Sequence, residues 1–408
     1  MSFVLYYYLT RINNNQKPKM SKFLNRADWT FPIPIRYGPG RIQELGTVCL
    51  ENGVKAPLIV TDQGSLDLPF ITEALESISN SGFKEVVFSQ VAQNPSAENI
   101  MAGRDTFIEG GHDAVIAIGG GSGMDAGKAI SLVANYKGDL WDFDYDKPLP
   151  DLGGTSSFPT LICIPTTAGT GAETESTAMV TDTTKGVKRC VWHPNQKPVT
   201  AILDPKLTIG LPQNITAWTG CDALVHAIEA LSVPELHPIC DGLALESIRL
   251  IFRNLPDVFK NGDNLESRGA MLVASCLAGI AFLKGLGLVH AMSHMVGAVC
   301  NTHHGLTNAV LLPLVLRYNE KGLGNKTSLI CQSIGLKSNT FDHLYNTVTS
   351  LLDELEIPSD LAAINVRQDQ IAEIAQKAFT DTAITTNPVP ITVCKIESLL
   401  CQAFSSAR

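Results

Sequence analysis

The sequence predicts an α/β domain with a mostly parallel sheet, followed by an all-helical C-terminal domain. Two observations lead to this fold class. Between about Ala56 and Pro205, short β-branched runs alternate with stretches of helical spacing, which is typical of βαβ units. After Pro212, apolar residues recur at helical spacing over long segments with almost no strand-like alternation. We therefore divide the chain into an extension over 1–30, an α/β domain over 31–208 and a helical domain over 209–408.

Composition sets the broad class of the protein. The chain of 408 residues has 31 Lys and Arg against 40 Asp and Glu, a formal net charge of −9, which argues against nucleic acid or an anionic membrane as partner. Its ten cysteines include no CxxC pair and are typical of reduced thiols in a cytoplasmic protein. The longest apolar stretch, Ala270 to Leu283, is shorter than the roughly 20 residues of a bilayer span, so we expect a buried core helix.

The first residues do not resemble a targeting signal. Met1–Thr10 is aromatic-rich and is followed by Lys17 and Lys19, whereas a signal peptide carries its positive charge first and ends in small residues. Either Met1 or Met20 is a start consistent with the sequence. We expect a cytoplasmic protein without a membrane segment.

The expected elements of the α/β half follow one another in order. Five runs bounded by turn-forming residues predict strands at Pro57–Thr61, Glu85–Val91, Ala114–Ile118, Leu161–Pro165 and Val199–Leu203. The spacing of apolar residues predicts helices at Ile71–Ser81, Ser96–Glu109 and Asp125–Asn135. Ligands of such sheets bind beyond the carboxyl ends of the strands, so the loops that follow these runs are the candidates for a binding site.

The helical half begins after a break at Lys206–Pro212, where prolines interrupt regular structure. Gly242–Lys260 and Ser267–Lys284 have the spacing of long helices, and Ile396–Phe404 that of a terminal one.

A glycine-rich loop, Gly119–Gly123, follows a predicted strand and opens a helix that contains Asp125 and Lys128. Glycines let the backbone approach a phosphate, and the free N–H groups of a helix start hold negative charge. The pattern counted from Gly119 lacks the third glycine of GxGxxG, because Met124 stands there, and no GK[ST] follows. The loop therefore predicts phosphate binding. The alternative is a tight turn with a purely structural role.

A second loop, Pro165–Glu173, leaves the next strand with threonines at 166, 167 and 170 among glycines. Its hydroxyls can bind a diphosphate or ribose, or instead satisfy local backbone as in an ST-turn. Asp62 ends the first strand, where a carboxylate accepts bonds from ribose hydroxyls and repels a 2′-phosphate. Together these loops predict one nucleotide site that prefers NAD to NADP.

Histidines cluster in the helical half, where four of the nine lie between His290 and His304. Asp222 and His226 stand at i, i+4, as do His290 and His294, so each pair shares a helix face. A set of Asp222, His226, His290 and either His303 or His304 suits Fe²⁺ or Zn²⁺ and not Ca²⁺ or Mg²⁺. Such a metal lowers the pKa of a bound alcohol or polarises a carbonyl, so a nucleotide site beside it indicates hydride transfer.

The motifs resemble those of the iron-containing (group III) alcohol dehydrogenases. From about Phe31 to beyond Asn319 they follow the order and spacing of that family: GGGSGMDAGKAI, IPTTAGTGAE, DPKL, TGCDALVHAIEA, GLGLVHAMSHMVGA and HHGLTNAVLLP. The resemblance implies a dinucleotide-binding α/β domain, a helical metal-binding domain, a site in the cleft between them and a homo-oligomer, a dimer or larger. It also implies NAD and Fe²⁺ as cofactors, with Zn²⁺ as the alternative metal.

Carried over position by position, the resemblance implies a specific set of site residues. The metal ligands fall on Asp222, His226, His290 and His304, and His294 matches a histidine near the nicotinamide that is a candidate proton relay. The implied cofactor contacts are Asp62, Asn94, Gly120, Gly121, Ser122, Asp125, Thr166, Thr167, Thr170 and Lys188.

One departure from the family pattern concerns the substrate. After Glu173 the family usually has Val-Thr, whereas this chain has Thr174-Glu175. A free carboxylate at this edge of the site disfavours acidic substrates.

We expect an NAD- and metal-dependent dehydrogenase that interconverts a small primary alcohol and its aldehyde. The alternatives are a hydroxy acid and its semialdehyde, or a polyol as in the related glycerol dehydrogenases. More distant ones are a dehydroquinate synthase-like lyase, which needs clustered basic residues, and a non-catalytic nucleotide-binding protein.

Overall fold

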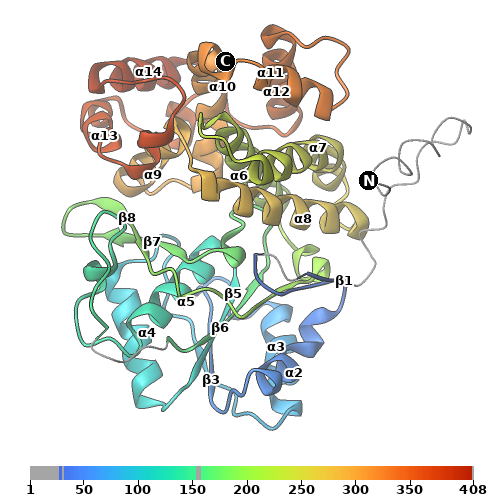
Figure 1. The fold of residues 1–408 in the computed structure, drawn as a ribbon, viewed down its shortest axis with the longest axis vertical. Coiled ribbons are helices and arrows are strands. Elements are labelled where there is room, and N and C mark those ends of the chain that lie inside the picture. Colours follow the sequence, from blue (N-terminus) through green and yellow to red (C-terminus); the bar gives the residue numbers. More distant parts are fainter. Residues whose placement is uncertain (1–26, 30–31, 153–157, 407–408) are drawn as a thin grey trace, which may run out of the picture.

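The computed structural model describes residues 27–29, 32–152 and 158–406. The expected N-terminal extension, with its two candidate start sites, lies outside the described residues, apart from a short strand at Ala27–Trp29. Figure 1 shows the α/β half of the molecule below the helical half, with helices α4 and α5 on one side of the sheet and α2 and α3 on the other.

Within the described residues, seven strands form the main sheet in the order β1-β2-β9-β6-β5-β3-β4, and only the β1–β2 pair is antiparallel. The bounds are β1 Ala27–Trp29, β2 Ile35–Tyr37, β3 Pro57–Val60, β4 Val87–Phe88, β5 Ala114–Gly119, β6 Thr160–Pro165 and β9 Thr200–Leu203. The expected mostly parallel sheet is confirmed. The predicted strand at 85–91 shrinks to two residues at the edge of the sheet, where only one neighbour supplies hydrogen bonds.

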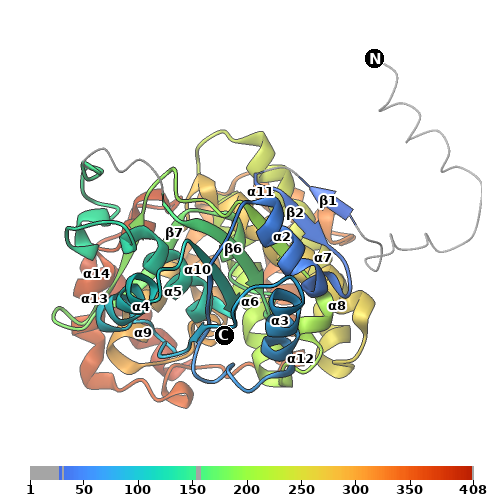
Figure 2. The ribbon, with the colours of Figure 1, turned by 90° about the horizontal axis from the view of Figure 1, so that it is seen from below.

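Four α-helices of the described α/β half cover the two faces of this sheet (Figure 2): α2 Leu45–Glu51, α3 Pro69–Asn80, α4 Ala97–Glu109 and α5 Gly121–Val133. Because side chains of a strand alternate, Leu58 and Val60 pack under α4 and α5, whereas Ile59 packs under α2 and α3. α4 begins with a capping box, in which the Ser96 hydroxyl accepts a bond from the Asn99 N–H.

An antiparallel hairpin of β7 (Thr177–Asp182) and β8 (Val187–Trp192) forms a separate sheet that the sequence did not predict. It packs against α5 (Figure 1). Along β8, alternate residues Lys188, Cys190 and Trp192 line the cleft, while Val191 packs into the core.

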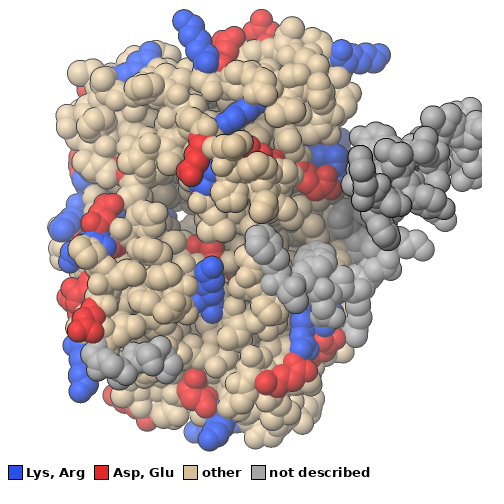
Figure 3. Space-filling model, in the orientation of Figure 1, with Lys and Arg blue, Asp and Glu red and all other residues tan. Residues whose placement is uncertain are grey.

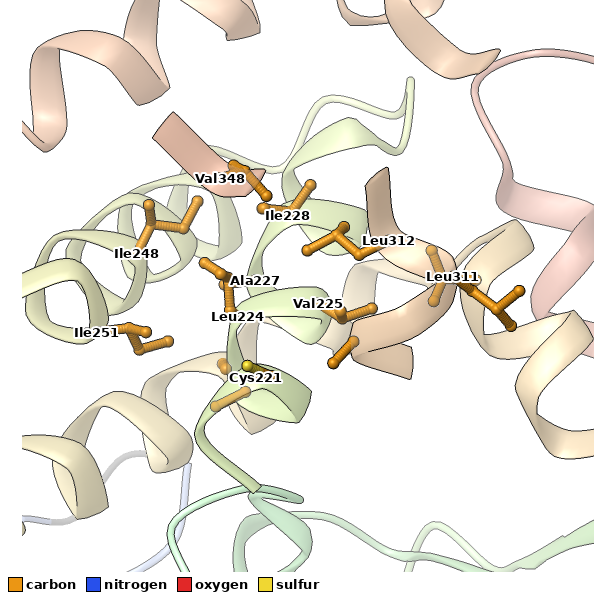
Figure 4. Close-up of a cluster of buried hydrophobic side chains, with 14 of the residues drawn as sticks. Cys221, Leu224, Val225, Ala227, Ile228, Ile248, Ile251, Leu311, Leu312 and Val348 are labelled. Carbon is orange, nitrogen blue, oxygen red and sulfur yellow. The ribbon is translucent and has the colours of Figure 1, made fainter. Parts of the chain in front are cut away.

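Nine α-helices make up the described part of the C-terminal half: α6 Gln213–Ser232, α7 Pro238–Lys260, α8 Leu265–Ala281, α9 Leu288–Cys300, α10 His304–Leu323, α11 Lys326–Ser333, α12 Phe341–Glu354, α13 Ile371–Ala378 and α14 Val393–Ser405. All residues of α6 from Thr219 to Ser232 are buried. Figure 4 shows Leu224 and Ile228 of α6 among side chains of α7, α10 and α12. The central helix thus carries its polar residues inside the protein.

One stretch of this half, Leu265–Lys284, is long and apolar enough to cross a bilayer by composition alone, but 72% of its apolar window is buried inside the protein. It comprises α8 and the turn Phe282–Lys284 that follows, and it packs against α6 and α7. This matches the core helix expected at Ala270–Leu283.

A buried arginine ties the junction between the halves to the helical domain. The Arg268 guanidinium of α8 donates to Thr216 Oγ1 at 2.9 Å and to the carbonyl of Gly262 at 2.8 Å, and further to the carbonyls of Ile209 and Leu211. Burial lowers the pKa of Arg268 to about 10, so the side chain stays charged at neutral pH. The segment between β9 and α6 is therefore fixed by hydrogen bonds from a buried cation.

We expect Arg268→Met to lower the free energy of unfolding by about 2–4 kcal/mol, because it leaves several buried acceptors without a donor. Urea denaturation followed by circular dichroism measures the change. Arg249→Met is the control, since that arginine pairs with Glu246 at the surface of α7 and is worth well under 1 kcal/mol. Equal stabilities of the two variants contradict the assignment.

Candidate metal and nucleotide site

A cleft of about 1300 Å³ lies between the two halves. Figure 3 shows the hollow between them, with acidic and basic side chains scattered over this face and not gathered in one patch. Its walls come from the loops after β3, β5 and β6, from the β7–β8 hairpin and from the helices of the C-terminal half. The cleft therefore opens at the carboxyl ends of the parallel strands, as expected for an open α/β sheet.

The two loops predicted to bind phosphates face each other across this end of the sheet. Gly119 ends β5 with φ of 142°, a conformation that favours glycine, and α5 starts two residues later. A Cβ placed on Gly121 would lie 2.8 Å from Thr170 Cγ2. Gly120, Gly121, Ser122, Thr166, Thr167 and Thr170 all line the cleft.

The remaining expected cofactor residues line the cleft too. Asp62 follows β3, and its Oδ2 accepts a bond from Ser65 Oγ at 2.7 Å. Asn94 Nδ2 donates to Asn301 Oδ1 at 2.7 Å and so links the two halves. Ser122 Oγ donates to the carbonyl of Gln93 at 2.6 Å.

Lys188 lies between the nucleotide loops and the helical domain. Burial lowers its pKa, while the carboxylates of Asp125 and Asp222 favour its charged form. Burial also raises the pKa of Asp125 to about 6 and that of Glu173 to about 7. The negative charge beside the phosphate loops is thereby reduced, which suits an anionic ligand.

Glu175, the departure from the family pattern, is buried and paired. Its Oε1 accepts from Lys128 Nζ at 2.7 Å, and its Oε2 accepts from the Thr177 N–H at 2.7 Å. Lys128 Nζ also donates to the carbonyl of Ala172 at 2.7 Å. The expected repulsion of acidic substrates requires a free carboxylate, and this one is balanced by a lysine.

The four expected metal ligands converge in the helical half. Asp222 and His226 project from one face of α6, His290 from the first turn of α9 and His304 from the first residue of α10. One donor atom from each lies within 4.8 Å of the other three. Glycine at 305 lets the start of α10 lie close to α6, because a Cβ there would lie 2.4 Å from the Trp218 carbonyl oxygen.

The motif spacing left open whether His303 or His304 belongs to the ligand group, and the structure distinguishes the two. His303 caps α10, since its Nδ1 accepts a bond from the Leu306 N–H. His304 joins the ligand group, with Nε2 3.5 Å from Asp222 Oδ1.

The donor set fits a first-row transition metal. Three imidazoles and one carboxylate are nitrogen and oxygen ligands of the kind that Fe²⁺ and Zn²⁺ take. Burial lowers the pKa of His226 to about 4 and that of His304 well below its usual value, so both rings keep free lone pairs. The donor atoms of this group therefore suit Fe²⁺ or Zn²⁺, the metals that the sequence predicted.

Residues that the sequence analysis did not single out hold the ligands in place. Glu229 accepts from the N–H groups of Gly287 at 3.0 Å and Val289 at 2.7 Å, and from His290 Nδ1 at 2.6 Å. Ser293 Oγ lies 2.9 Å from His304 Nδ1. Glu229 had a sequence signal, because it follows His226 by three residues on one helix face.

His294 lines the cleft outside the metal group. Its Nδ1 donates to Asp381 Oδ2 at 2.9 Å, and its ring stacks on that of His304 with centroids 5.3 Å apart. Asp381 also caps the short turn Thr382–Thr386, where its Oδ1 accepts from the Ala383 N–H.

Fold and site together define a metal-dependent oxidoreductase linked to a nucleotide cofactor. Two family models match the chain, iron-containing alcohol dehydrogenase over residues 32–205 and the C-terminal domain of the Fe-containing alcohol dehydrogenase family over 216–404. The chain belongs to the iron-containing alcohol dehydrogenase family. The expected family, fold class and enzyme class are thus confirmed.

Named relatives agree with this assignment. The chain is 33% identical to the 1,3-propanediol dehydrogenase of Citrobacter freundii, over 92% of this chain and 98% of that one. It is also 33% identical to the NAD-dependent methanol dehydrogenase of Bacillus methanolicus, over 89% and 96%. A crystal structure of 1,3-propanediol oxidoreductase superposes with a TM-score of 0.86 at 32% identity, covering 93% of this chain and all of that one. NAD and iron are the cofactors that fit this family.

We expect Glu229→Gln to weaken metal binding about 10- to 100-fold, because an amide cannot accept all three bonds that now orient His290 and the start of α9. Competition with a chromogenic chelator measures the affinity for Zn²⁺. Glu246→Gln, at the surface of α7, serves as the control and should bind as the unmodified protein does. Unchanged affinity in Glu229→Gln would show that the carboxylate does not position the ligand.

Proposed function

We propose that this protein transfers a hydride between NAD and a small primary alcohol/aldehyde pair, with iron at the Asp/His group and Zn²⁺ as the alternative metal. The observation that carries the proposal is the presence in one cleft of the facing phosphate-type loops and the converged ligand set. When bound, such a metal supplies Lewis-acid chemistry toward an alcohol or carbonyl oxygen.

Each part of the cleft has a proposed role. Asp222, His226, His290 and His304 hold the metal. Gly120, Gly121, Ser122, Thr166, Thr167 and Thr170 hold the diphosphate, Asp62 the adenosine ribose, and Asn94, Asp125 and Lys188 the rest of the cofactor.

We propose His294 as the proton relay of the site. Asp381 accepts from Nδ1–H of His294 and so leaves the lone pair on Nε2, where it can take a proton. Asp381 is a positioning residue in this scheme.

The charges of the cleft favour an uncharged alcohol over a hydroxy acid. Of the described residues that line it, three are lysines, Lys188, Lys206 and Lys284, and none is an arginine. Lys284 Nζ is paired with Asp241 at 2.5 Å, Lys188 interacts with two carboxylates, and Lys206 is exposed. A substrate carboxylate therefore has no dedicated cation, and a synthase-like reaction on a phosphate has no basic cluster.

We further propose a cytoplasmic homo-oligomer. Of the ten free cysteines, six are buried and two are partly buried, which suits a reducing compartment. Leu236 and Ile239, 83% and 58% exposed at the start of α7, offer apolar surface for self-association.

The first test is metal-dependent reduction of NAD. Protein stripped of metal and reloaded anaerobically with Fe²⁺ or Zn²⁺ should reduce NAD with short alcohols and diols, and less well with hydroxy acids. His290→Ala should abolish turnover while NAD binding, measured by fluorescence titration, stays unchanged. Full activity of this variant in chelator contradicts the metal assignment, and activity confined to hydroxy acids overturns the substrate class.

A second test concerns the choice between NAD and NADP. Asp62→Ala should raise kcat/KM for NADP relative to NAD by about tenfold or more, since it removes a carboxylate that repels a 2′-phosphate. Asp67→Ala, an exposed residue of the same turn outside the cleft lining, is the matched control. An unchanged ratio in Asp62→Ala places the adenosine ribose elsewhere.

A further inference from the structure

Asn308 has an unusual place beside the metal ligands. It lies one turn after His304 on α10, and its side chain is fully buried. Its Nδ2 is 2.7 Å from Asp222 Oδ1, 3.2 Å from His290 Nε2 and 3.1 Å from His304 Nε2. One amide nitrogen thus contacts three of the four ligand side chains.

The orientation of this amide follows from its neighbours. A carboxylate and the lone pairs of neutral imidazoles only accept hydrogen bonds, so the NH₂ group must face them. Asn308 Oδ1, at the other end of the amide, is buried without a partner in the described chain. An unsatisfied buried carbonyl costs about 1–3 kcal/mol, so packing alone favours an apolar side chain at this position.

We propose that Asn308 is a positioning residue that converges the ligands before the metal binds. One N–H bond to Asp222 Oδ1 fixes the rotation of that carboxylate and leaves its other lone pairs for the metal. The contacts of Nδ2 with His290 Nε2 and His304 Nε2 hold these two atoms close together until the metal takes their lone pairs. This inference rests on the proposed metal function of the Asp/His group.

The spacing of the ligand atoms agrees with this role. A tetrahedral site with bonds near 2.1 Å has ligand atoms about 3.4 Å apart. Asp222 Oδ1 lies 3.5 Å from His304 Nε2 and 4.0 Å from His290 Nε2. The three atoms that Asn308 contacts therefore need little movement to bind a metal, and a preformed site loses less free energy to reorganisation.

The test compares metal binding by the full chain and by Asn308→Leu, which keeps the branching at Cγ and removes the N–H donors. We expect its affinity for Zn²⁺, measured by chelator competition, to fall about 10- to 100-fold. The visible absorption spectrum of the Co²⁺-loaded variant should also change, because the Asp222 carboxylate is free to rotate.

Asn319→Leu is the matched control on the same helix. Asn319 is buried and donates to Asn387 Oδ1 at 2.9 Å, away from the ligand group. Without metal, both variants should unfold at a lower temperature than the unmodified protein, because Asn308→Leu takes a donor from the buried Asp222 carboxylate and Asn319→Leu takes one from Asn387 Oδ1. Only Asn308→Leu should also lose metal affinity. A merely structural asparagine at 308 predicts that both folded variants bind metal as the unmodified protein does.

Metal affinity and Co²⁺ spectrum unchanged in Asn308→Leu overturn the inference. Should that variant fail to fold, Asn308→Ala undergoes the same two measurements with the same expected and contradicting results. An unmodified protein that binds no Zn²⁺ or Co²⁺ overturns the proposed metal function itself, which separates the two failures.

Discussion

The metal-binding half of this protein depends on one buried carboxylate. Glu229 of α6 accepts bonds from the backbone at the start of α9 and from the His290 ring. A buried charge is costly unless it is fully hydrogen-bonded, and a helix N-terminus stabilises it further. The position of α9 is therefore fixed relative to α6, which also carries Asp222 and His226. Through α9 the same anchor places Ser293 against His304 and His294 against Asp381.

In the α/β half, buried carboxylates are balanced by a lysine or have a raised pKa. Lys128 and Glu175 neutralise each other below the second loop, while burial and, to a smaller degree, the Glu175 charge raise the pKa of Asp125 to about 6 and that of Glu173 to about 7. The negative charge near the N-terminus of α5 is thereby reduced, and a helix N-terminus favours phosphate oxygens. Within the described hairpin, Lys188 is the lysine that is not exposed, and its charge interacts with Asp222 of the helical half.

Periodicity and motif spacing predicted the parallel sheet, the long helices and the shared faces of Asp222 with His226 and of His290 with His294. The residues that hydrogen-bond to the expected site residues were harder to predict from the sequence. Glu229 and Asn308 stand at helical spacing from a ligand, so a search of each ligand's helix face finds them. Asp381 lies 87 residues from His294 in a segment of short turns, and no local pattern connects the two. The β7–β8 hairpin was missed because no strand was predicted between the runs at 161–165 and 199–203.

Gly171 of the second loop allows the two halves of the protein to pack closely. The sequence predicts a binding role for the threonine hydroxyls of this loop and no packing role for its glycines, but Gly171 packs on α8. A Cβ on Gly171 would lie 2.6 Å from Gly279 Cα, and one on Gly279 would lie 2.4 Å from the Gly171 carbonyl. Backbone therefore rests directly on backbone, and no side chain separates the nucleotide loop from α8. Since α8 packs on α6, which bears Asp222 and His226, this contact fixes the second loop relative to two of the expected metal ligands.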